Sequence, residues 1–61
     1  MLLLHRMTTK YDVGEAVLID GTKHDGKVGT VLKPVGEDEY LVVLEDGTQI
    51  LVQQESLMLR H

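Results

Sequence analysis

Apolar residues in this chain occur in five short runs, and turn-forming residues separate one run from the next. No stretch holds a 3.6-residue apolar period for long enough to form an amphipathic helix. Short runs with turns between them are typical of a small barrel or meander. The pattern therefore predicts an all-β fold of four to five antiparallel strands, at residues 16–19, 27–33, 40–44, 49–53 and 57–59.

Four features predict how these strands begin, bend and end. Asp46-Gly47 lies between two apolar runs and is a strong hairpin signal. Pro34 is expected to end the second strand, because proline cannot donate to a central ladder. Gly29 lies inside that strand and indicates a bulge, a sharp bend or a close backbone approach. The polar step at residues 54–56 is expected to form one turn of 3₁₀ helix before the last strand.

The alternation within the strands divides the apolar residues into two sets. One set is the predicted core, which comprises Val17, Ile19, Val31, Tyr40, Val42, Leu44, Ile50, Val52 and Leu57. The other set points elsewhere and comprises Leu18, Leu32, Leu41, Val43, Leu51 and Met58. A strand with one wet face should alternate apolar and polar residues, and residues 40–44 and 49–53 do not. Either the second set caps the ends of a very small barrel, partly under residues 2–4, or it forms an exposed patch of the kind that marks a protein interface.

Residues 1–10 stand apart from the predicted domain, which spans residues 11–61. In one interpretation, the leucines at positions 2–4 form an extra edge strand or an apolar tail that docks on another surface. In the other, Met7 is the natural start and the first six residues are an upstream extension. The leucine run is too short for a signal peptide or a membrane span. The sequence contains no cysteine, so it has neither a disulfide framework nor a thiolate zinc site. Together these features predict a cytoplasmic protein with no membrane association.

Charge separates two classes of partner. Ten acidic residues against six basic ones give a net charge of −4, whereas affinity for nucleic acid comes mainly from Lys and Arg that neutralise phosphates. The one basic grouping comprises Lys23, His24, Lys27 and Lys33. An acidic turn at Glu37, Asp38 and Glu39, together with Glu45-Asp46, either brackets one end of the barrel as an acidic face for a basic partner or consists of solubilising turn residues.

The segment from Gly14 to Leu32 resembles the KOW motif, and residues 11–59 resemble an SH3-like barrel. Gly14-Glu15 matches the start of the motif and the apolar run at 17–19 matches its strand, while Gly26-Lys27-Val28-Gly29-Thr30-Val31 matches its close. The resemblance implies binding of RNA or protein, commonly through the loop after the first strand. His24-Asp25 stands where the motif typically has lysine.

These observations predict a non-catalytic binding module. Its expected partner is another protein or a second copy of the chain, bound through Leu41, Val43 and Leu51, with steering from the acidic turn. The alternative is a nucleic-acid or ribonucleoprotein accessory domain that uses the basic grouping. No cofactor, metal or small-molecule substrate is expected, because the three histidines lack metal-ligand spacing and so short a chain offers little room for a cleft that shifts a carboxylate pKa.

Overall fold

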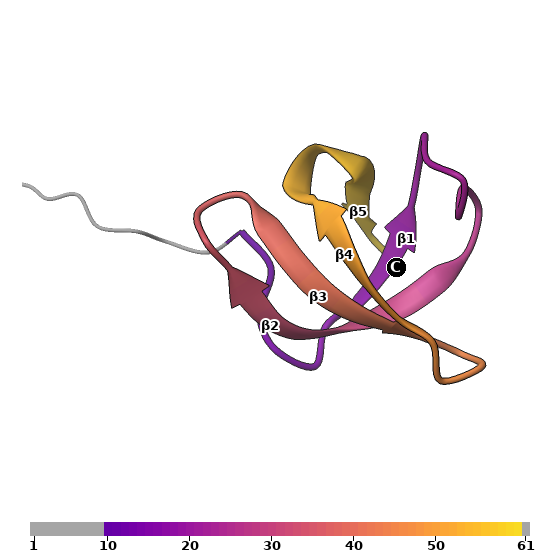
Figure 1. Cartoon of the computed structure of the whole chain (residues 1–61), viewed down its shortest axis with the longest axis horizontal. Helices are drawn as coiled ribbons and strands as arrows, with labels where there is room; N and C mark the ends of the chain where they lie inside the picture. The colour runs from indigo at the N-terminus through magenta and orange to yellow at the C-terminus, as the bar shows by residue number, and fades with distance from the viewer. Residues whose placement is uncertain (1–9, 61) are drawn as a thin grey trace, which may run out of the picture.

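The protein folds into one antiparallel sheet of five strands in the computed structural model, which describes residues 10–60 (Figure 1). The strand order across the sheet is β4-β3-β2-β1-β5. The elements are β1 (Ala16–Ile19), β2 (Val28–Val35), β3 (Glu39–Leu44), β4 (Gln49–Gln53), the 3₁₀ turn η1 (Gln54–Ser56) and β5 (Leu57–Leu59). The predicted all-β fold, its five antiparallel strands and the 3₁₀ turn are confirmed, although β2 extends two residues beyond its predicted end at residue 33. The predictions for the first nine residues lie outside the described residues.

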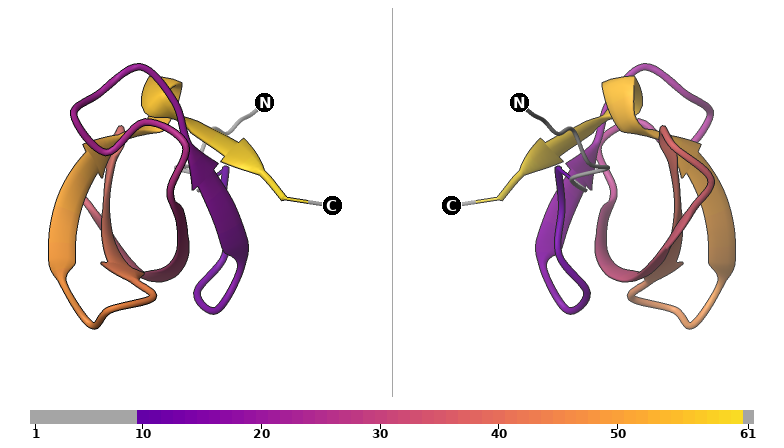
Figure 2. Two further views of the ribbon diagram at one scale, coloured as in Figure 1. Left: turned by 90° about the vertical axis from the view of Figure 1, so that its right-hand side faces the viewer. Right: turned by 90° about the vertical axis from the view of Figure 1, so that its left-hand side faces the viewer.

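The sheet is rolled around its core but is not closed. Figure 2 shows β4 on one side of the roll and β5, which follows η1, on the other. Within residues 10–60, ladders join β1 to β2, β1 to β5, β2 to β3 and β3 to β4, and none joins β4 to β5. Both marginal strands therefore keep one edge without a strand partner among the described residues.

The inner face of the roll carries the core. Eight of the nine predicted core residues are buried, and Ile50 is half-buried and packs against them. One further residue, Tyr11, joins the cluster with only 3% of its surface exposed. Tyr11 is absent from the predicted core, because it lies outside any alternating run. Its one signal is that Tyr11 and Tyr40 are the only aromatic residues in the chain.

The two tyrosines form a buried polar cluster beneath η1. Their rings meet edge to face, with centroids 5.5 Å apart and an interplanar angle of 78°. The Tyr11 hydroxyl donates to the Leu57 carbonyl at 2.7 Å, and the Tyr40 hydroxyl donates to Gln54 Oε1 at 3.2 Å. The Tyr40 oxygen also accepts from the backbone N–H groups of Lys10 (2.9 Å) and Tyr11 (3.3 Å). Burial raises the pKa of Tyr11, and the nearby Tyr40 and Glu15 raise it further.

β2 corrects one sequence expectation and settles another. Pro34 does not end the strand, which continues to Val35 with Pro34 in register with Tyr40. The pairing of β1 with β2 stops at Thr30, so beyond that residue β2 has a ladder on one side only and a missing N–H is tolerated there. The register shift lies between Val31 and Lys33 rather than at Gly29. Gly29 instead marks a close approach, because a Cβ there would collide with Val42 Cγ1 and would lie 2.9 Å from the Val43 carbonyl oxygen.

The predicted hairpin between β3 and β4 is confirmed. The Leu44 N–H donates to the Thr48 carbonyl at 2.8 Å, and the Gly47 N–H donates to the Leu44 carbonyl at 2.9 Å. Gly47 adopts φ 91°, a conformation that favours glycine. Asp46 Oδ1 accepts from the Thr48 N–H at 2.9 Å, and hydrogen bonding to Thr48 holds the pKa of Asp46 below its ordinary value. This turn fixes the register of β4 against β3.

Candidate functional site

Three apolar side chains lie on the outer face of β3 and β4, and we call them the outer strip: Leu41, Val43 and Leu51. Leu41 stands directly opposite Leu51, so the two side chains are cross-strand neighbours on that face. Leu41 and Val43 are half-buried, whereas Leu51, on the marginal strand, has 57% of its surface exposed. Among the described residues, the outer strip is therefore a partly exposed apolar surface.

Polar residues border the outer strip on both sides. On β2, Lys33 is in register with Leu41 and Thr30 is in register with Val43. On β4, the exposed side chains of Gln49 and Gln53 flank Leu51. An apolar centre with a polar rim is the usual anatomy of a protein-binding patch.

The structure brings together only part of the predicted basic grouping. Lys23, His24 and Lys27 lie on the loop at residues 20–27, between β1 and β2. Lys33 lies six residues beyond Lys27 along an extended strand, a separation of about 20 Å, and borders the outer strip instead. Within the loop, Asp25 Oδ1 accepts from the Gly21 N–H at 2.6 Å, so a carboxylate is fixed among the cations.

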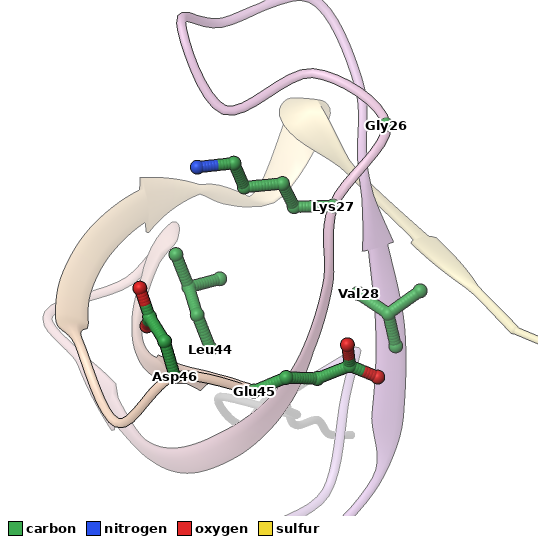
Figure 3. Close-up of a pocket in the computed structure, with 6 residues that line it drawn as sticks. All are labelled: Gly26, Lys27, Val28, Leu44, Glu45 and Asp46. Atoms are coloured by element: carbon green, nitrogen blue, oxygen red, sulfur yellow. The ribbon is translucent and has the colours of Figure 1, made fainter.

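Lys27 lines a pocket of about 370 Å³ at one end of the roll (Figure 3). Its lining comprises Gly26, Lys27, Val28, Leu44, Glu45 and Asp46. The Lys27 side chain extends across the opening toward the side on which Leu44 and Asp46 lie, and its charge also helps to lower the pKa of Asp46. Because two carboxylates share the pocket with one ammonium group, Lys27 offers little net charge to a phosphate.

The sequence suggested that the two acidic turns bracket one end of the molecule, but they lie at opposite ends of β3. Glu37 and Asp38 are exposed and Glu39 is half-buried, in and after the turn that precedes β3. Glu45-Asp46 follows the other end of the same strand. A six-residue strand keeps the two turns about 20 Å apart. The Asp38 carbonyl accepts from the Gln54 N–H at 2.7 Å, which ties the first acidic turn to the end of β4 and so to the strand that carries Leu51.

Neither tyrosine is available to a ligand, since both are buried in the core. His24 is half-buried, and its Nδ1 has no hydrogen-bond partner among the described residues. In residues 10–60, no group of three or more His, Asp or Glu side chains is placed to hold a metal ion. His5 and His61 lie outside the described residues.

The described part of the chain contains no helix with the length and apolar character needed to cross a membrane. Comparison of the chain with protein families, with curated proteins and with solved structures found no match.

Proposed function

We propose that this chain is a non-catalytic protein-binding module that uses the outer strip, and that its rolled sheet is an SH3-like barrel of the KOW type. The observation that carries the functional part is Leu51, which is 57% exposed beside Leu41 on a marginal strand. A leucine exposed alone on a protein surface needs no explanation, but here three apolar side chains adjoin one another on two paired strands.

The fold part of the proposal rests on strand order and connections. Four consecutive strands form a meander, and the fifth, which follows the 3₁₀ turn, pairs with the first. Gly29, within the segment that resembles the KOW motif, allows β2 and β3 to approach closely. Both features suit a sheet that rolls tightly over a small core.

The energetics favour a modest interface. Full burial of a leucine contributes about 1.5–3 kcal/mol, and only the surface that is still exposed remains to be buried in a complex. Leu51 therefore dominates the outer strip, and Leu41 and Val43 add less. Glu37 and Asp38, whose turn is tied to the end of β4, would speed the encounter with a basic partner more than they would raise affinity.

A photo-reactive residue at Gln49 tests the proposal, because Gln49 is exposed and flanks Leu51. We expect protein adducts, identified by mass. Their yield should fall about tenfold with Leu51→Ser and should also fall with Leu41→Lys. The matched control is Met58→Ser, which removes a similarly exposed apolar side chain (49%) from β5, at the opposite margin. Adducts that respond equally to Leu51→Ser and Met58→Ser would reject the outer strip as the site.

The same experiment separates protein from nucleic acid. An interface built on apolar burial keeps its adducts as salt rises, whereas phosphate binding weakens steeply. A second photo-reactive residue, placed at Thr22 in the β1–β2 loop, tests the accessory-domain alternative. Nucleic-acid adducts at this position that disappear as salt rises would support that alternative instead.

A further inference from the structure

The edge of β4 that has no strand partner among residues 10–60 presents backbone hydrogen-bonding groups at defined residues. In an antiparallel ladder, opposite residues alternate between hydrogen-bonded and non-hydrogen-bonded pairs. The Leu44 N–H donates to the Thr48 carbonyl, so these two form a hydrogen-bonded pair, and the next such pairs along the register are those of Ile50 and Val52. The N–H and C=O groups of Gln49, Leu51 and Gln53 therefore point away from β3, toward the open margin of the sheet.

The sequence of β4 is nearly the same when read backwards. It runs Gln-Ile-Leu-Val-Gln, with Leu51 at its centre, a β-branched residue on each side and glutamine at both ends. Two such strands that run antiparallel and meet at Leu51 place like against like at every position. Gln49 then faces Gln53 of the second copy, and Ile50 faces Val52.

We propose that β4 pairs with β4 of a second copy of this chain, antiparallel about a two-fold axis at Leu51. The proposal rests on the proposed function, since it names the partner of the outer strip. Leu51 of each copy donates its N–H to the carbonyl of the other, and each Gln49 exchanges backbone bonds with the Gln53 that faces it. On the outer face, Leu41 and Leu51 of both copies form one continuous apolar row that ends at a Lys33 on either side.

The edge of β4 lacks the devices that normally prevent such pairing. Edge strands are usually protected by charged residues, proline, a bulge or short length. β4 has five residues with no charge, no proline and no register shift against β3. The other margin is better protected, because β5 has three residues and Arg60 follows it directly.

Charge near the seam is also compatible with a second copy, despite the net charge of −4 on each chain. No charged pair would face across the five paired positions. Asp46 and Glu55 flank the strand and Glu39 stands opposite Gln53 on β3, so added salt would screen the repulsion of these carboxylates across the seam. Association should therefore hold or strengthen as salt rises.

The contact area sets the expected affinity. A five-residue seam is about 17 Å long and buries on the order of a few hundred Å² per copy, which is below the total of ~1,200 Å² in a standard interface. The dimer should accordingly be weak, with a dissociation constant between about 10 μM and about 1 mM. A domain of this affinity would dimerise when it is concentrated or held in an array.

Sedimentation velocity on the full chain, from about 10 μM to about 1 mM, tests the pairing. We expect a monomer that dimerises with concentration and a Leu51→Pro variant that stays monomeric over the same range. Because the Leu51 N–H points away from β3, proline removes the central intermolecular donor and leaves the β3–β4 ladder intact. The amide spectrum of the variant confirms that it is folded.

Two charge variants test the register without the use of proline. Gln49→Glu with Gln53→Lys places opposite charges across an antiparallel seam, and Gln49→Lys with Gln53→Lys places like charges there. Both variants put the same lysine opposite Glu39 of its own chain, so they differ at position 49 alone. We expect the first to dimerise at least tenfold more tightly than the second. A parallel seam would bring like charges together in both variants.

Each outcome decides the proposal. A wild-type chain that is monomeric at about 1 mM overturns it, and so does a dimer in which the two charge variants associate equally. A monomeric chain that still gives Leu51-dependent adducts with another protein overturns the dimer alone and leaves the binding function intact. A chain that neither dimerises nor gives adducts rejects both.

Discussion

At the scale of single residues, Gly29 is the only glycine in residues 10–60 at which an added Cβ would meet other atoms within 4 Å. It is buried in β2, and a Cβ there would collide with Val42 Cγ1 and approach the Val43 carbonyl. We expect Gly29→Ala to lower the free energy of unfolding by about 1–3 kcal/mol, the usual cost of an overpacked core. For a domain of this length that is a large share of a total of roughly 3–9 kcal/mol.

Urea denaturation at neutral pH measures this effect. Thr30→Val is the matched control, since Thr30 is the next residue of the same strand and is exposed. Its expected change is within about 0.5 kcal/mol. Equal midpoints for Gly29→Ala and the wild type would show that β2 and β3 are not in such close contact.

At the scale of elements, β5 completes the fold although it has only three residues. It supplies Leu57 to the core, pairs with β1, and offers the carbonyl to which Tyr11 donates. A chain that ends after Ser56 loses all three contributions together. We expect it to be unfolded, because a domain of about 60 residues has little stability to lose.

Circular dichroism and the dispersion of the amide spectrum test this expectation. The control is a chain that ends after Leu59 and keeps the whole of β5. It should fold like the full chain. A folded product that ends after Ser56 would show that the first four strands are sufficient.

The strands were predictable because local signals agree with the tertiary structure. Alternation identified the core face, and Asp46-Gly47 predicted the hairpin that sets the β3–β4 register. Pro34 was misread because a rule for central strands does not apply where β2 has a ladder on one side only. Whether a strand is central or marginal depends on the strand order, which periodicity does not reveal.

The same limit applies to the candidate site. The sequence identified Leu41, Val43 and Leu51 as apolar residues outside the core. It did not show that Leu41 faces Leu51 across a ladder, nor that the strand that carries Leu51 is at the margin of the sheet. It also grouped Lys33 with the loop lysines, because nearness in sequence is a poor guide along an extended strand.

At the scale of the whole molecule, the tyrosine cluster connects the two ends of the described chain. Tyr11 precedes β1, Leu57 begins β5, and Tyr40 accepts from the backbone of Lys10 and Tyr11 while it donates to Gln54. These bonds hold the lead-in segment against η1 and β5. β5 forms one margin of the sheet, and buried hydrogen bonds between residues far apart in sequence thus stabilise this margin.

This cluster makes the stability of the whole domain sensitive to alkaline pH. Burial raises the pKa of Tyr11 in the folded state above its ordinary value of 10.0. As pH rises past about 10, the unfolded chain loses this proton first, which favours unfolding. The contribution of Tyr11 is therefore complete below pH 10 and is lost as pH rises through the folded-state pKa.

Tyr11→Phe separates this effect from the titration of other groups. At neutral pH the variant should be less stable by about 1–3 kcal/mol, because the buried Leu57 carbonyl loses its donor. Between about pH 9 and pH 11, however, its urea midpoint should fall less than that of the wild type, since the two proteins differ only in the Tyr11 hydroxyl. If the urea midpoints of the two proteins declined in parallel, Tyr11 would ionise as readily in the folded chain as in the unfolded one. That result would contradict the burial of the Tyr11 hydroxyl.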